Sequence, residues 1–276
     1  MAAEFTINQC KHFVAVINIG KISHFSHCGN FGGLGLHPLV KKKALCGSES
    51  VGKGYTEFLF KNKYSVAIGH NRQATTGKVN DRNAHPFGFR IGEGWCFGVH
   101  NGIILNKSVI ADAYSLEEPE VDSEVVFWAI AKRVNDGMEV ADAIVQVTRT
   151  IESVASYAFA YLDTANKDIY LWRSEERPMV ILDARVLGLG RWFSSTKEIF
   201  TEAWQSLRGA LGSITKVTYQ EARAHRIYRL KESGPLQVVT DIQVAPRIQF
   251  PAEPDIDWTI PKEEYEDLSQ TDLFAR

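Results

Sequence analysis

Four short segments in the middle of the sequence carry polar residues of the kind that bind small molecules. They are GHNRQATTG (69–77), NAHPF (83–87), HNGII (100–104) and DSE (122–124). Taken singly, each has an ordinary structural explanation. Arg72 at the end of a strand is usually solvated, and His85 before a proline can simply occupy a turn. Asn101-Gly102 is the strongest short-range signal of a β-hairpin, and Asp122 can cap a helix.

In their order and spacing, the four segments resemble the glutaminase domain of the class II glutamine amidotransferases. In that family a Gly-His-x-Arg-x-Ala-Thr segment precedes Asn-Ala-His-Pro, then His-Asn-Gly-Ile, then an acidic residue at a helix start. The spacings from Arg72 to His85, on to Asn101 and on to Asp122 match that order. The resemblance covers roughly residues 64–205 and, more loosely, 10–232.

The residue types suit the binding and hydrolysis of free glutamine, which the resemblance implies. The planar guanidinium of Arg72 fits the α-carboxylate, and Asp122 can bind the α-ammonium group. Hydrolysis of the side-chain amide passes through an oxyanion, which needs preorganised donors. The resemblance gives that role to the Asn101 side-chain amide and the Gly102 backbone N–H. It places two further residues in the glutamine pocket, Thr75 and His85.

The nucleophile that the resemblance implies is a cysteine at the mature N-terminus, with its own α-amine as general base. A free α-amine has a pKa of about 7.7–8.0, which is near enough to neutrality to activate a thiol. Cys10 is the candidate, because it immediately precedes the first predicted strand. Residues 1–9 would then be a propeptide or N-terminal extension that must be removed. The other cysteines, which fall in the following loop or inside a strand, are Cys28, Cys46 and Cys96.

We therefore expect a class II glutamine amidotransferase-like protein, a glutaminase that forms a Cys10 thioester and releases glutamate and ammonia. No cofactor or metal is implied for this reaction. Only a tail follows residue 232, so a separate synthase subunit would take the ammonia, or it would be released. The alternative is a catalytically silent relative that acts in binding or assembly because its N-terminal cysteine is not exposed. Lys11 stands where the family usually has a small residue, and Gln73 stands where it usually has an aromatic residue. Because Gln73 lies in the recognition segment, a related amide remains an alternative substrate.

The elements that must position these residues are predicted from hydrophobic periodicity and turn residues. We expect strands over 12–19, 63–72, 156–163, 168–174, 178–184 and 186–195, hairpins over 94–105 and 214–230, and helices over 122–136, 138–151 and 196–207. The first hairpin would turn at Asn101-Gly102, Asp122 and Ser123 are N-cap candidates, and 30–54 would be mostly loop. Short turns favour antiparallel pairing. The expected fold is α+β, and the resemblance makes it a four-layer α/β/β/α sandwich of the N-terminal-nucleophile hydrolase type.

Composition limits the remaining possibilities. The 276 residues carry a net charge of −2, which gives no reason to expect nucleic acid or an anionic membrane as a partner. No apolar stretch is long enough to span a bilayer and no secretory signal is apparent, so we expect a cytoplasmic protein. The four cysteines form no CxxC pair and no histidines are paired at ligand spacing, which argues against a zinc site. Without a secretory signal in a chain of this length, we also expect no disulfide framework. GSESVGKG (47–54) ends in glycine where a phosphate-binding loop needs a hydroxyl.

The last part of the chain differs in character from the rest. Residues 251–276 hold eight acidic and two basic side chains, a net charge of −6, and proline is frequent from residue 246 onwards. This composition is typical of an extended or disordered segment. We therefore expect an amidotransferase-like domain over 10–243 and an acidic, proline-containing tail over 244–276.

Overall fold

The computed structural model describes residues 25–28, 40–43, 66, 68–71, 77–187, 190–206, 217–231 and 234–243. All of them belong to a unit that runs from Met1 to Ala245. The predicted strand over 12–19, the N-terminal extension and the acidic tail lie outside the described residues. The domain boundaries therefore stay predictions.

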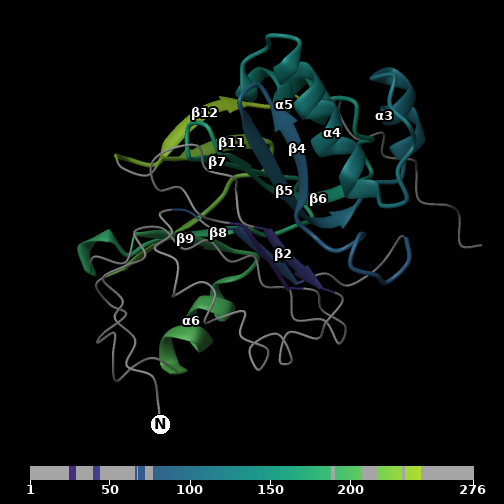
Figure 1. Cartoon of the computed structure of the whole chain (residues 1–276). Coiled ribbons are helices and arrows are strands. Elements are labelled where there is room, and N and C mark those ends of the chain that lie inside the picture. The colour runs from purple at the N-terminus through teal and green to yellow at the C-terminus, as the bar shows by residue number, and fades with distance from the viewer. Residues whose placement is uncertain are drawn as a thin grey trace, which may run out of the picture. The chain divides into compact units, whose positions relative to one another are not determined.

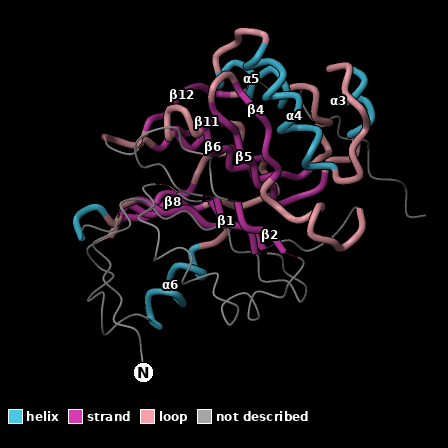
Figure 2. The backbone as a smooth tube through the Cα atoms, in the orientation of Figure 1, coloured by secondary structure: helices cyan, strands magenta, loops and turns pink. Residues whose placement is uncertain are grey.

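The described strands form three sheets in which every pair is antiparallel (Figures 1 and 2). The largest sheet has the order β12-β11-β7-β6-β5-β4, with β4 Phe87–Ile91, β5 Gly94–Ile103, β6 Ser156–Asp163, β7 Asp168–Arg173, β11 Arg226–Leu230 and β12 Gln237–Asp241. A three-stranded sheet has the order β2-β1-β3, with β1 Phe25–Cys28, β2 Val40–Lys43 and β3 Ile68–Asn71. The other has the order β10-β8-β9, with β8 Val180–Asp183, β9 Arg191–Ser194 and β10 Thr218–Glu221.

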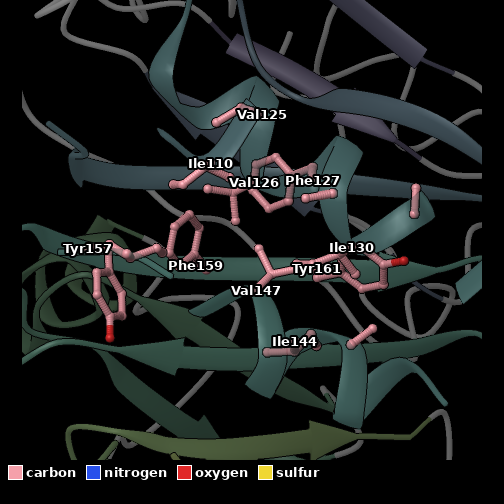
Figure 3. Packing of buried hydrophobic residues seen from close by; sticks show 14 of the residues in the cluster. Ile110, Val125, Val126, Phe127, Ile130, Ile144, Val147, Tyr157, Phe159 and Tyr161 are labelled. Carbon is pink, nitrogen blue, oxygen red and sulfur yellow. The ribbon is translucent and has the colours of Figure 1, made fainter. Parts of the chain in front are cut away.

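Helices cover one face of the six-stranded sheet. They are α4 (Asp122–Asn135) and α5 (Val140–Thr148), with the short α3 (Lys107–Ala113) beside α4. Phe127 and Ile130 of α4 and Ile144 of α5 pack on Phe159 and Tyr161 of β6, and all five are buried (Figure 3). Burying such large apolar side chains is the main stabilising contribution to this layer.

A second core lies between the six-stranded sheet and the two smaller sheets. Val99 of β5 and Leu171 of β7 share it with Ile68 of β3 and with Ile181 of β8. On the opposite face of the β10-β8-β9 sheet, Val180 and Leu182 pack with Phe200 of helix α6 (Lys197–Ser206), while a 3-10 turn spans Arg185–Leu187. Along β8, Ile181 faces the core between the sheets, whereas its neighbours Val180 and Leu182 face α6. This small sheet is therefore covered on both faces. The layers are therefore helices, sheet, sheets and helix, which confirms the predicted α/β/β/α sandwich.

The predicted hairpin at Asn101-Gly102 is wrong. Strand β5 runs through both residues and stays paired with β6 as far as the Ile103–Ser156 register position. Gly102 has a φ of +149°, and a Cβ there would lie 1.9 Å from the carbonyl oxygen of Ser156. The glycine is needed for close backbone approach and not for a turn. The actual hairpin joins β4 and β5, which pair from Phe87–Gly98 to Ile91–Gly94.

The predicted hairpin over 214–230 is also wrong. Strand β10 pairs with β8, whereas β11 pairs with β7 and β12 in the six-stranded sheet. The chain therefore crosses from one sheet to another between Glu221 and Arg226. Within the predicted loop over 30–54 the structure places strand β2, and strands β1, β4 and β12 and helix α3 were not predicted. The predicted strand over 156–163 and the helix over 122–136 are confirmed, the helix ending one residue earlier.

Gly98 controls how closely α4 lies on β5. A Cβ at this position would lie 2.1 Å from Cδ1 of Phe127, which is fully buried. We expect Gly98→Ala to lower the free energy of unfolding by roughly 1–3 kcal/mol, since overpacking forces backbone shifts. Denaturant titration measures this loss. Phe127→Leu should relieve the clash, so the double variant should lose less than the two single losses together. Wild-type stability in Gly98→Ala would contradict this packing.

Candidate functional site

Strand β5 presents candidate residues to both of its faces. Its residues alternate between the core under the helices, which contains Cys96, and the core between the sheets, which contains Phe97 and Val99. The cross-strand partners agree with this alternation, because His100 lies opposite Phe159 and Asn101 lies opposite Ala158. His100 therefore faces the helices, and Asn101 faces the smaller sheets, on the side where β3 contacts β5.

Asp122 lies in the first turn of α4 and is buried. Its Oδ2 accepts a hydrogen bond of 2.8 Å from the backbone N–H of Ile104, just beyond the end of β5. The positive end of the helix dipole favours a carboxylate at this position. The structure thus holds a buried carboxylate against Ile104, which lies two residues along the chain from Gly102. Because the N-cap residue is Val121 and no side chain caps the helix, the prediction that Asp122 or Ser123 is the N-cap is wrong.

Ser123 makes the second polar contact between α4 and β5. Its Oγ lies 2.9 Å from Nδ1 of His100, and both side chains are buried. The His100 ring stacks on Phe159, with 4.5 Å between the ring centroids. From the sequence, Ser123 was expected only as an N-cap candidate and His100 was given no role, although both belong to the quoted segments.

His85 is buried beside a second histidine that the sequence analysis did not select. Its ring centroid lies 4.3 Å from that of His70 and 4.9 Å from that of Phe87. His70 lies on β3, two residues from Ile68, so the side chains of His70 and Ile68 face the same side, toward the core between the sheets. The structure thus brings His85 to β3, the strand that lies on the same side of β5 as Asn101.

Three of the predicted site residues, Cys10, Arg72 and Thr75, lie outside the described residues. Arg72 follows directly on Asn71, the last residue of β3. The structure therefore describes Asn101, Gly102, Asp122 and His85 of the predicted site, and the roles of all seven remain predictions.

Cys96 differs from a reactive cysteine in every described respect. It is fully buried on β5, and burial raises the pKa of its thiol to about 12. A thiol is nucleophilic only as the thiolate. Cys96 is therefore unsuited to be the nucleophile, which is consistent with the choice of Cys10.

The described residues contain neither a metal-binding cluster nor a membrane-spanning helix. In the described ranges, no three His, Cys, Asp or Glu side chains are grouped so that they could hold a metal ion. Within the part of the chain that the structure describes, no helix combines the length and apolarity that crossing a bilayer requires.

Comparison with known proteins identifies related sequences. Residues 49–164 match the model of the family described as glutamine amidotransferases class-II. Glutamine–fructose-6-phosphate aminotransferase (isomerizing) of Streptococcus mutans is 34% identical over 133 residues, which are 47% of this chain and 20% of that protein. The Staphylococcus aureus enzyme of the same name is 28% identical over 193 residues, 69% of this chain and 29% of that protein. The chain thus spans about a fifth to under a third of these curated relatives.

Solved structures share the fold. The structure described as the allosteric regulatory enzyme of purine biosynthesis aligns with a TM-score of 0.61 and 17% identity, over 80% of this chain and 43% of that chain. Glutamine phosphoribosylpyrophosphate amidotransferase from B. subtilis aligns with a TM-score of 0.59 and 18% identity, over the same shares. At these identities the likeness supports the arrangement of layers described above.

Because Cys96 is fully buried, we predict that its thiol reacts slowly with alkylating reagents in the folded protein. With its pKa raised to about 12 by burial, the Cys96 thiol is almost entirely protonated at pH 8. We expect iodoacetamide at pH 8 to leave Cys96 unmodified in the folded protein and to alkylate it after denaturation. Because the pKa is raised, reactivity should increase only as the pH rises toward 12. Peptide mapping by mass spectrometry measures the modification. Rapid alkylation of Cys96 in the folded protein at pH 8 would contradict this environment.

Proposed function

We propose that the chain carries a class II glutamine amidotransferase domain and hydrolyses the side-chain amide of glutamine to glutamate and ammonia. The observation that carries the proposal is the hydrogen bond from Ile104 N–H to buried Asp122. It fixes a carboxylate beside the segment that holds Asn101 and Gly102. An anion for the α-ammonium group and donors for an oxyanion would then lie on adjoining elements, as a glutamine pocket requires.

In the proposed reaction, the Cys10 thiolate attacks the amide carbon and forms a tetrahedral oxyanion. The freed α-amine of the same residue takes the thiol proton and gives it to the departing ammonia. The Asn101 side-chain amide and the Gly102 N–H donate hydrogen bonds to the oxyanion. Water then attacks the thioester, which releases glutamate and restores the thiol.

Substrate recognition is assigned to residues around this centre. Arg72 would bind the α-carboxylate through its planar guanidinium, and Asp122 would bind the α-ammonium group. His85 is buried with His70 near β3, and the proposal places it in the glutamine pocket together with Thr75. A related small amide is the alternative substrate, since Gln73 lies in the recognition segment.

The fate of the ammonia is a further part of the proposal. The related enzymes named above are aminotransferases, so transfer to an acceptor is one outcome. We propose that a separate synthase subunit takes the ammonia or that it is released. Both outcomes share the same glutaminase half-reaction.

A catalytically silent protein that acts in binding or assembly is the second candidate. The position of Cys10 favours it, since nine residues precede this cysteine in the sequence. An N-terminal nucleophile cannot form until the bond between Gln9 and Cys10 is cut. The active glutaminase and the silent protein therefore differ in whether the peptide bond between Gln9 and Cys10 is cut.

Removal of residues 1–9 and the loss of Cys10 together test the proposed nucleophile. We expect the intact mass of the active protein to correspond to a chain that starts at Cys10. Cys10→Ala should reduce glutamate release by at least roughly 10³-fold, because no other group replaces the nucleophile. A wild type that keeps residues 1–9 and releases no glutamate would favour the silent protein. Equal release by wild type and Cys10→Ala would remove Cys10 from the mechanism.

Asp122→Asn tests the ammonium site. The amide oxygen of asparagine can still accept from Ile104 N–H, so the fold should be kept while the charge is lost. We expect the KM for glutamine to rise by roughly 10-fold or more, since a hydrogen bond to a charged group contributes about 1.5–3 kcal/mol. Steady-state kinetics measure this change. The matched control is Asp136→Asn, which removes a carboxylate paired with Arg133 at the other end of α4. An unchanged KM in Asp122→Asn would contradict the assignment.

A further inference from the structure

We propose that His100 and Ser123 are positioning residues that hold the oxyanion-binding segment of β5 against the first turn of α4. This inference rests on the proposed function, and it assigns a role to two residues that the reaction itself does not use. We call the pair of contacts His100 Nδ1–Ser123 Oγ and Ile104 N–Asp122 Oδ2 the β5–α4 lock.

The two contacts of the lock bracket the proposed oxyanion donors. They measure 2.9 Å and 2.8 Å, and the side chains of His100, Asp122 and Ser123 are all buried. On β5 the lock begins immediately before Asn101 and ends two residues after Gly102. On α4 it uses two consecutive residues of the first turn. The segment that would bind the oxyanion is therefore fixed at both ends to the element that would bind the α-ammonium group.

The His100 ring is held in place by an aromatic stack. It lies on Phe159 of β6, and Phe159 lies in turn on Trp172 of β7, with 4.8 Å between the latter two centroids. Phe127 of α4 meets Phe159 edge-on at 5.7 Å, and Figure 3 shows both rings in the core under the helices. Offset and edge-to-face contacts of this kind restrict the rotation of buried rings.

His100 also lies against the backbone of Gly102. A Cβ built on Gly102 would lie 2.8 Å from Nε2 of His100. The Nε2 side of the His100 imidazole thus lies against Gly102, whose N–H is proposed to bind the oxyanion, while Nδ1 contacts Ser123 of α4. Displacement of the ring would move β5 at Gly102 relative to α4.

The location of His100 indicates an indirect role. It is 3% exposed and faces the helices, whereas Asn101 faces the opposite side of the sheet. His100 therefore acts on the reaction through the backbone of β5. Donors to an oxyanion act only when they are preorganised, and a displacement of about 1 Å can reduce a rate by roughly 10²-fold.

Four variants test the lock. His100→Phe keeps a ring on Phe159 and removes Nδ1, Ser123→Ala removes the partner hydroxyl, and a third variant combines the two. We expect each single change to lower kcat for glutamate release roughly 10-fold, with the KM for glutamine within about twofold, because Ile104 still holds Asp122. The double variant should be no more than about twofold slower than the slower single variant, since both remove one contact. His100→Asn places a polar atom near the position of Nδ1 and should restore kcat to within about threefold of wild type.

The control is Gln146→Ala, which removes the 3.1 Å hydrogen bond between α5 and Arg133 of α4. Any loss of stability there should leave kcat unchanged. Additive losses in the double variant, or lower stability with unchanged kcat in His100→Phe and Ser123→Ala, would overturn the proposal.

Amide hydrogen exchange separates failure of the lock from failure of the proposed function. In His100→Phe, exchange of the peptide that contains residues 101–104 should accelerate at least roughly 10-fold, and in Gln146→Ala it should stay as in wild type. Unchanged exchange in His100→Phe would overturn the lock even if the wild type is an active glutaminase. A wild type that releases no glutamate would overturn the proposed function and the catalytic effect of the lock, while the exchange result would still decide whether the contacts hold β5.

Discussion

Close approach of β5 to its neighbours is the constraint on which the rest of the described structure depends. Gly98 leaves the space that the Phe127 ring of α4 occupies, and Gly102 leaves the space in front of the Ser156 carbonyl. Any larger residue at either position would separate β5 from the helix or from β6. The polar contacts of Asp122 and Ser123 reach β5 only because α4 lies this close. Packing and the candidate site are therefore consequences of the same two glycines.

The site combines polar contacts with an apolar surrounding. Asp122 and His100 are buried in or beside the core that contains Phe159, where an unsatisfied polar group would cost free energy. Their contacts with Ile104 and Ser123 offset that cost and fix the helix relative to the strand. The other face of β5 adjoins β3, with His70 and His85 packed against each other. Asn101 therefore faces the side of β5 away from the helices, whereas His100 and its contact with Ser123 lie beneath them.

Much of this arrangement could be predicted from the sequence, because the relevant patterns are local. The helix that begins at Asp122 and strand β6 have clear apolar periodicity, and the four polar segments kept the order that suggested the family. The hairpin at Asn101-Gly102 could not be judged locally. Gly102 is required by the close approach of the Ser156 carbonyl, which belongs to a residue more than fifty positions away. Without knowledge of the partner strand, a glycine needed for such close contact looks the same in sequence as one that forms a turn.

The capping role of Asp122 and Ser123 was wrong for the same reason. Their side chains contact β5, and this long-range contact replaces the local cap that their residue types favour. Likewise, β10 and β11 have a hairpin pattern but belong to different sheets, since β10 completes the sheet of β8. The residues of the candidate site could be proposed from the sequence, whereas the contacts that support them required the fold.

The crossing between β10 and β11 has a consequence for the order in which the chain can assemble. Strand β7 pairs with β6 on one side and with β11 on the other, and β11 follows only after the chain has formed all of β8, β9 and β10. During synthesis on a ribosome, β7 is therefore an open edge until residues beyond Leu230 have emerged. Such long sequence separations between paired strands slow folding. Among the described strands, the last two of the six-stranded sheet follow every strand of the two smaller sheets along the chain, although the candidate site lies near the opposite edge.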